Sequence, residues 1–187
     1  MENKVGDAQW MNKFPILQTE RLTLRELRPE DARAIFSMRS NKAVNRFIAR
    51  QDMTEASNAE ELVEKTIKAY HEGRAIAWAG LVRENEQIIG TCGFNKIDRD
   101  NHWAEIGGEL STEFWGRQLA FEAVQSIVNY GFTNMDLHRI EAFIDPRNRG
   151  AIAIMEALNF QKEAHFREKI FFNGSYMDMA VYARIGE

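Results

Sequence analysis

One stretch of the chain, residues 104–134, constrains the fold more than any other. It reads AEIGGELSTEFWGRQLAFEAVQSIVNYGFTN. Its first part alternates apolar Ile106 and Leu110 with Glu105 and Glu109, which is the period of a strand with two different faces. After a polar break, apolar residues recur at the spacing of a helix that buries one side; they are Leu119, Ala120, Ala123, Val124, Ile127, Val128 and Gly131. The stretch therefore predicts a strand, a short turn and a long helix.

The turn WGRQLA, residues 115–120, lies where this helix begins. The N-terminus of a helix presents unpaired backbone N–H groups and a partial positive charge, a combination that suits a phosphate group. Arg117 adds a formal positive charge at the same place. The turn is therefore a candidate phosphate-binding site.

The same residues resemble the acetyl-CoA-binding signature of the GNAT superfamily of N-acetyltransferases. More narrowly, they resemble the RimJ/RimL-like branch, which contains the ribosomal-protein N-terminal acetyltransferases and typically shows A-E-I-G-Y-x-L-S-P-x-Y-W-G-K-G-Y-A-T-E-A. The resemblance implies that the co-substrate is acetyl-CoA. The implied contacts with it fall on Leu110, Ser111, Trp115, Gly116, Arg117, Gln118, Leu119 and Ala120.

Gln118 departs from this pattern, because the branch carries a glycine there. A glycine lets the backbone approach a pyrophosphate closely. The Gln118 side chain must therefore point away from the pyrophosphate or weaken its binding. We expect Gln118→Gly to tighten binding if the side chain crowds the pyrophosphate, and also to cost a little stability, because glycine is a poor helix residue.

A second segment, DPRNRGAIAIMEALNF, resembles the branch pattern D-P-x-N-x-x-S-x-x-L-x-E-K-L-G-F. In that pattern the asparagine contacts the pantetheine region of coenzyme A, and it corresponds to Asn148. The tyrosine that often serves as general acid in the wider superfamily would fall at Met155, so that acid is absent from its usual place.

The opening TERLTLRELRPEDA and the closing NGSYMDMAVY also resemble this branch, so the resemblance runs from about residue 18 to the end. No repeat or linker divides the chain, and we expect residues 1–187 to form a single acetyltransferase domain. Residues 1–17 are weakly patterned and are predicted to be an N-terminal arm that packs through Trp10 and Phe14.

The order of predicted elements is β-α-α-β-β-β-α-β-α-β-β. This order predicts an α/β (α+β) fold, a GNAT-like mixed, twisted and splayed sheet of about seven strands with helices on both faces. The resemblance implies that strands 104–111 and 138–144 splay apart around the pantetheine arm, and that helices after residues 41 and 54 cover the acceptor pocket. Thr54 is a predicted helix cap, Asn159 a predicted left-handed cap, and Asn173-Gly174 a predicted hairpin turn.

Acetyl transfer to an amine requires that the amine first lose a proton, and the pKa is ~8 for an α-amino group and ~10.4 for lysine. Glu105 and Glu109 lie four residues apart on one strand face, so either can serve as the base. Glu109 is expected to be the better candidate because it is nearer the phosphate turn. Glu105 is the second, and it matches the glutamate of the A-E-I-G pattern. The alternative for each is a solvent-facing carboxylate without a catalytic role.

Composition excludes several other classes. The net charge of −4 provides no global basic surface for nucleic acid. Cys92 is the only cysteine, so an internal disulfide and a multi-cysteine metal site are excluded, and the four histidines lack metal-ligand spacing. No apolar run is long enough to span a membrane, and the first residues lack a signal peptide's apolar block. We expect a cytoplasmic protein without a metal, either a monomer or a homodimer.

The predicted function is transfer of an acetyl group from acetyl-CoA to a primary amine, in particular a protein N-terminal α-amino group of the ribosomal-protein type. Two alternatives remain open from the sequence. One is acetylation of a small amine, such as a polyamine or an aminoglycoside. The other is a non-catalytic acyl-CoA-binding sensor with the same fold.

Overall fold

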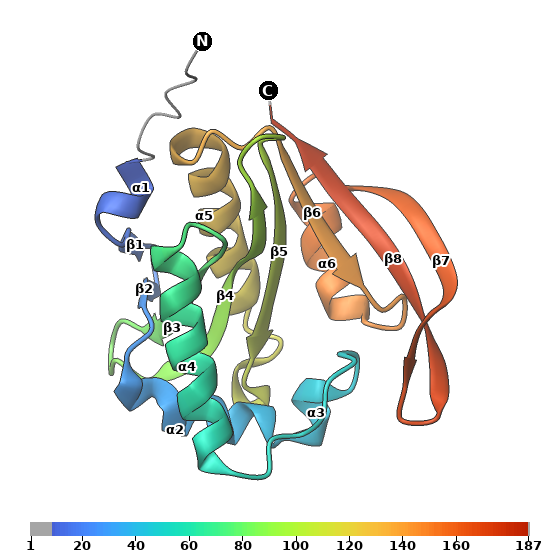
Figure 1. The fold of residues 1–187 in the computed structure, drawn as a ribbon, viewed down its shortest axis with the longest axis horizontal. Helices are drawn as coiled ribbons and strands as arrows, with labels where there is room; N and C mark the ends of the chain where they lie inside the picture. The colour runs from blue at the N-terminus through green and yellow to red at the C-terminus, as the bar shows by residue number, and fades with distance from the viewer. Residues whose placement is uncertain (1–8, 187) are drawn as a thin grey trace.

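Eight strands form one sheet in the computed structural model, which describes residues 9–186 (Figure 1). Their order across the sheet is β1-β2-β3-β4-β5-β6-β8-β7. All neighbours are antiparallel except β5 and β6, which are parallel. The strands are β1 Leu17–Gln18, β2 Leu22–Glu26, β3 Ile76–Val82, β4 Ile88–Asp98, β5 Trp103–Leu110, β6 Arg139–Ile144, β7 Gln161–Phe172 and β8 Ser175–Ile185.

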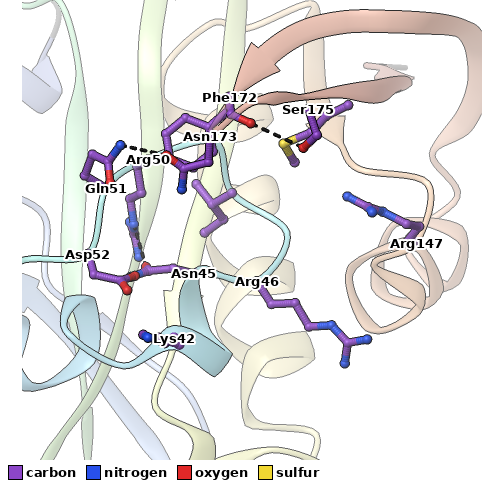
Figure 2. Close-up of a pocket in the computed structure, with 12 residues that line it drawn as sticks. Lys42, Asn45, Arg46, Arg50, Gln51, Asp52, Arg147, Phe172, Asn173 and Ser175 are labelled. Atoms are coloured by element: carbon purple, nitrogen blue, oxygen red, sulfur yellow. Dashed lines mark hydrogen bonds between the residues drawn. The ribbon is translucent and has the colours of Figure 1, made fainter.

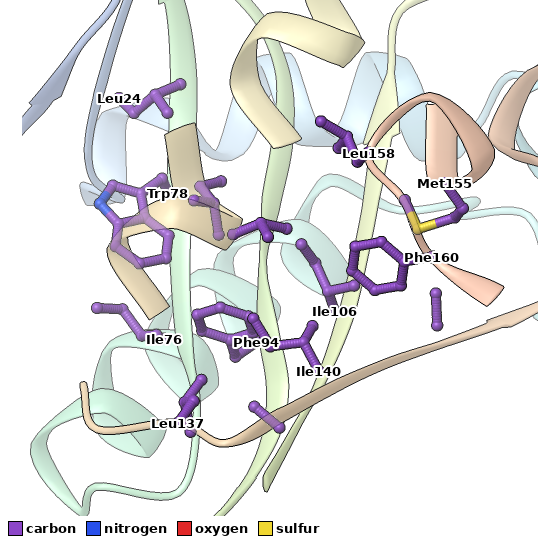
Figure 3. Packing of buried hydrophobic residues seen from close by; sticks show 14 of the residues in the cluster. Leu24, Ile76, Trp78, Phe94, Ile106, Leu137, Ile140, Met155, Leu158 and Phe160 are labelled. Carbon is purple, nitrogen blue, oxygen red and sulfur yellow. The ribbon is translucent and has the colours of Figure 1, made fainter. Parts of the chain in front are cut away.

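Helices cover both faces of this sheet, as the sequence predicts (Figure 1). Helices α2 and α4 pack on one face of β3 through a cluster that contains Ile35, Val63 and Leu81. Helix α5 packs on the opposite face through a larger cluster around Trp78 and Phe94 (Figure 3). The helices are α1 Gln9–Asn12, α2 Ala32–Arg39, α3 Lys42–Asn45, α4 Ala56–His71, α5 Leu119–Asn134 and α6 Arg149–Ala157, with short 3-10 turns η1 Pro29–Asp31 and η2 Thr112–Phe114.

The eighth strand, β1, is a two-residue addition to the expected seven, and it lies at the end of the predicted N-terminal arm. The described part of that arm packs on the core. Trp10 is buried, and its carbonyl oxygen accepts a hydrogen bond from the Tyr70 hydroxyl at 2.9 Å. The Phe14 ring lies 4.8 Å from the Tyr70 ring. Residues 1–8 lie outside the described part of the chain.

Local turn chemistry is confirmed at three of the four predicted positions. Asn159 adopts φ 63°, and Asn173 and Gly174 adopt φ 47° and 77° in the hairpin between β7 and β8. These are the left-handed conformations that such turns require. The predicted cap at Thr54 is wrong. Helix α4 begins one residue later, after Glu55, and no side chain caps its first turn.

Candidate active site

Strands β5 and β6 are hydrogen-bonded over only three residues each. The paired segments are 103–105 and 139–141, although β5 continues to Leu110 and β6 to Ile144. Beyond these pairs the two strands diverge, as Figure 1 shows. The splay expected between these strands is therefore confirmed. The facing edges leave backbone donors and acceptors free to bind an extended group placed between the strands.

The turn before α5 carries a run of free backbone donors. Within the described residues, none of the N–H groups of residues 116–121 donates to a protein acceptor. Gly116 has φ 73°, and the Trp115 indole N–H donates to the Leu110 carbonyl oxygen at 2.9 Å, which ties the turn to the end of β5. A pyrophosphate fits this set of donors at the start of a 16-residue helix.

Gln118 lies immediately before α5 and has φ 62°, in the left-handed region. Its side chain makes no capping hydrogen bond and is exposed. A residue with a Cβ pays a steric penalty in this conformation that glycine avoids. The backbone conformation thus accounts for the glycine that the RimJ/RimL-like pattern carries at this position.

We predict that Gln118→Gly raises the stability of the protein by up to ~1 kcal/mol, because glycine adopts positive φ without the Cβ penalty. This reverses the stability cost expected from the sequence, since residue 118 precedes the helix. Thermal unfolding of the parent and of Gln118→Ala, which removes the side chain but keeps the Cβ, provides the comparison. Equal melting temperatures for the glycine and alanine variants would contradict the argument.

Arg117 is exposed on this turn, with its guanidinium carbon 5.4 Å from the centre of the Phe114 ring. Its carbonyl oxygen accepts a hydrogen bond of 3.0 Å from Arg21 Nη1. Arg21 also forms a 2.7 Å ion pair with Glu122 in the first turn of α5. Arg21, which was not predicted as a site residue, therefore stabilises the turn through its contacts with Arg117 and Glu122. The exposed guanidinium of Arg117 forms no ion pair with another described residue and can contact a phosphate.

We predict that Arg117→Glu removes most of the thermal stabilisation given by acetyl-CoA or coenzyme A, because it replaces a cation beside the phosphate turn with an anion. A ligand at 100 times its Kd stabilises a protein by about 2.7 kcal/mol, so the parent shift is easily measured. Arg33→Glu, at an exposed position on α2, is the matched control and keeps the parent shift. An unchanged shift in Arg117→Glu would place the phosphates elsewhere.

Glu109 is held between two arginines. Arg39 Nε lies 2.7 Å from Glu109 Oε1, and Arg50 forms an ion pair with Oε2. The Glu109 side chain is only 2% exposed. Burial lowers the pKa of Arg50, although the charge of Glu109 opposes that shift. Because both carboxylate oxygens are engaged, Glu109 is poorly placed to take a proton from an amine, contrary to the order expected from the sequence.

Glu105 is in a different environment, at the last position where β5 pairs with β6. Its side chain makes no hydrogen bond or ion pair with another described residue, and the residue is half-buried. Burial raises the pKa of Glu105, the neighbouring Glu141 raises it further, and Lys96 opposes the shift. A carboxylate with a raised pKa and free oxygens has the properties of a general base.

We predict that Glu105→Gln stabilises the protein at pH 8 relative to the parent and that this gain disappears near pH 4. The folded state disfavours ionised Glu105, so the parent loses stability as the pH rises through the raised pKa. Below the unfolded pKa of ~4.3 the carboxyl is protonated in both states and the difference vanishes. Denaturant unfolding at both pH values measures this, with Glu113→Gln as an exposed control. A gain independent of pH would contradict it.

The other predicted coenzyme contacts are partly occupied within the protein. The Ser111 N–H donates to the Ile89 carbonyl oxygen at 2.8 Å, and Leu119 is buried, whereas Ala120 is half-buried. Asn148 caps α6, its side-chain oxygen accepting from the Ala151 N–H at 3.2 Å. Its contact with pantetheine stays a prediction.

Met155 lies in the core, where the superfamily's acidic tyrosine would stand. Its thioether has no proton to donate. Burial raises the pKa of the Cys92 thiol to about 12, so Cys92 is not a nucleophile. The reaction at this site must therefore proceed without a protein acid or thiolate at these two positions.

A cavity of about 280 Å³ lies near the open end of the splayed strands (Figure 2). One wall comes from α3 and the segment that follows it, and the opposite wall from the turn between β7 and β8. Gln51 Nε2 donates to Asn173 Oδ1 at 2.9 Å and joins the two walls, and Arg147 lines the side next to α6. Of the two helices expected to cover an acceptor pocket, α3 borders this cavity, whereas α4 contributes none of its lining residues. The arginines of the cavity were not predicted.

In the part of the chain that the structure describes, no group of three or more histidine, cysteine, aspartate or glutamate side chains is placed to hold a metal ion. Among residues 9–186, no helix is both long and apolar enough to cross a membrane.

Comparisons with known proteins agree with this geometry. Residues 21–161 match the family described as "Acetyltransferase (GNAT) domain". The chain is 38% identical over 167 residues to the uncharacterized N-acetyltransferase p20 of Bacillus licheniformis, covering 89% of this chain and 94% of that protein. It is 27% identical over 158 residues to a spermidine N(1)-acetyltransferase of Vibrio cholerae, covering 84% and 89%.

Among solved structures, the fold is similar to RimL, a ribosomal L7/L12 α-N-protein acetyltransferase, in complex with coenzyme A. The TM-score is 0.86 at 23% identity, and the match covers 92% of this chain and 98% of that one.

The chain belongs to the GNAT family of acetyltransferases, and it is an acetyl-CoA-dependent N-acetyltransferase. The expected family, fold and enzyme class are therefore confirmed. The relatives act on amines of more than one kind, so the acceptor is a separate question.

Proposed function

We propose that this enzyme acetylates the α-amino group of a protein N-terminus, as the ribosomal-protein acetyltransferases of the RimJ/RimL-like branch do. The observation that carries the proposal is the early end of the pairing between β5 and β6. The unpaired backbone N–H groups of residues 116–121 lie at one side of the opening that results. The cavity between α3 and the β7–β8 turn lies near its open end. The likeness to RimL supports it.

Acetyl-CoA supplies the acetyl group as a thioester, and the turn before α5 binds its phosphates. Unpaired N–H groups on β5, beyond Glu105, donate to the acetyl oxygen as negative charge develops there. Glu105 removes the proton from the acceptor ammonium, directly or through water. The new C–N bond forms as the C–S bond breaks, and the departing thiolate is stable enough to need no strong acid, which accommodates Met155.

A small polycation, such as a polyamine or an aminoglycoside, is the second acceptor class. A spermidine acetyltransferase among the relatives speaks for it. The cavity speaks against it, because four of its lining side chains are cationic and one is anionic. Membership of the GNAT acetyltransferase family speaks against the alternative of a non-catalytic acyl-CoA-binding sensor.

We propose a single acetyltransferase domain that acts in the cytoplasm, where protein N-termini are made, without a resident metal, a nucleic-acid partner or a membrane. It acts as a monomer or a homodimer.

We predict that Glu105→Gln lowers kcat/KM at pH 7 by about 10²-fold, the usual contribution of a general base. The loss shrinks as the pH rises above ~8, where the α-amine is already neutral. The measurement is a pH–rate profile of thiol release with an N-terminal peptide as acceptor, with acetyl-CoA binding measured in parallel.

Glu109→Gln is the comparison variant. Removing its charge leaves Arg39 and Arg50 without their partner, and breaking a buried ion pair typically costs about 3–5 kcal/mol. Its defect therefore appears in the melting temperature and does not diminish at high pH. If Glu105→Gln retains parent activity at pH 7, proton removal falls to solvent.

A further inference from the structure

We infer that the acceptor carries an anionic group, a carboxylate or a phosphate, close to its reactive amine. This inference rests on the proposed function, and it names the chemistry of the acceptor that the cavity between α3 and the β7–β8 turn selects. For a protein acceptor it means acidic residues directly after the N-terminal residue.

The charge of the cavity lining is the first observation. Four cationic side chains line it, and Asp52 is the single carboxylate among its lining residues. The cations come from three separate places in the chain, namely Lys42 and Arg46 on and after α3, Arg50 in the next segment, and Arg147 before α6. Figure 2 shows them around the same space.

The partners of these cations are the second observation. Within residues 9–186, Lys42 and Arg46 form no ion pair, and the Arg46 guanidinium lies 5.1 Å from the centre of the neighbouring Phe47 ring. Arg147 pairs with Asp145 at 2.6 Å, yet its own side chain remains 66% exposed. The cavity therefore offers at least two cations whose charge no protein carboxylate neutralises.

Asp52 keeps its negative charge, which acts on Arg50, and its Oδ1 accepts a hydrogen bond of 2.6 Å from Asn45 Nδ2. Arg50 forms an ion pair with Glu109, and Glu109 forms a second ion pair with Arg39. Asn45 Oδ1 accepts from Arg50 Nε at 2.7 Å. These bonds fix Arg50 and Asn45 in the wall of the cavity, whereas Lys42 and Arg46 are exposed beside it.

Such a lining selects acceptors by charge. An anion 4 Å from a cation gains about 1 kcal/mol in water and more near a protein surface, and a polycation is repelled by the same amounts. Two uncompensated cations therefore predict at least a 10-fold preference for an acidic acceptor over a neutral one. Increasing ionic strength weakens this preference.

The experiment measures kcat/KM for three peptides that share an N-terminal serine and differ only in the next two residues, which are Asp-Asp, Asn-Asn or Lys-Lys. Spermidine and O-phosphoethanolamine are the small-molecule arms, one cationic and one anionic. We expect the order Asp-Asp, then Asn-Asn, then Lys-Lys, with each step about 10-fold, and compression of the series in high salt.

A double variant, Lys42→Gln with Arg46→Gln, tests whether the cations of the cavity cause the preference for acidic peptides. It should lose about 10-fold more activity on the Asp-Asp peptide than on the Asn-Asn peptide, so that the preference between the two disappears, with an unchanged KM for acetyl-CoA. Lys65→Gln, an exposed lysine on α4 outside the cavity, is the control and should leave the series unchanged. Circular dichroism and melting temperature confirm that the variants fold.

The outcomes separate the two ideas. Peptide turnover without preference for Asp-Asp overturns the inference and leaves the proposed function standing. Turnover of O-phosphoethanolamine but no peptide supports the inference and overturns the peptide acceptor. Turnover of spermidine alone overturns both. A raised KM for acetyl-CoA in the double variant would show that the cations serve the coenzyme, and that also overturns the inference.

Discussion

The site depends on the place where β5 leaves β6. The register of β4 against β5 shifts between Phe94 and Lys96, opposite Ile106 and Glu105, so that Asn95 is the additional residue of a bulge. A bulge bends its strand and increases the local twist, and β5–β6 pairing stops at the same level. A Cβ at Gly107 would lie 2.3 Å from Asn95 Nδ2, so the absent side chain leaves room for the side chain of the bulge residue. The bulge in β4 and the end of β5–β6 pairing therefore coincide at Glu105.

A buried charge cluster holds the helices over this opening. Glu109 on β5 pairs with Arg39 at the end of α2 and with Arg50 beyond α3. Its net contribution to stability is small, because desolvating three charges offsets much of their attraction. Its effect is geometric, since it fixes the segment after α2 against the sheet and orders one wall of the cavity. Glu109 therefore orders one wall of the cavity, while the Glu105 side chain, without such partners, is the base in the mechanism that we propose.

The parts of this arrangement that follow local rules were predictable from the sequence. Periods of 2 and 3.6 predicted β5 and α5, and the Asn173-Gly174 pair predicted the last hairpin. The different surroundings of the two glutamates were not predictable, because alternation shows which residues share a face but not which distant charge lies beside each one. Arg39 lies 70 residues from Glu109 in the chain. The departure at Gln118 was visible, but its meaning depended on a φ value that only the structure supplies.

The positive charge of the cavity lining also affects the pKa of a bound amine, and therefore how strong a base the reaction needs. A bound amine reacts only after losing its proton, and nearby cations disfavour the ammonium form and so lower the pKa of the amine. In the complex that we propose, Lys42, Arg46 and Arg147 act in this direction, and an anionic group on the acceptor offsets the repulsion between these cations and the amine. For the proposed α-amine acceptor, which already titrates near pH ~8, a single half-buried carboxylate such as Glu105 would then suffice as the base. The buried Met155 in place of a tyrosine is consistent with a reaction that needs no general acid, because the thiolate departs without a proton donor.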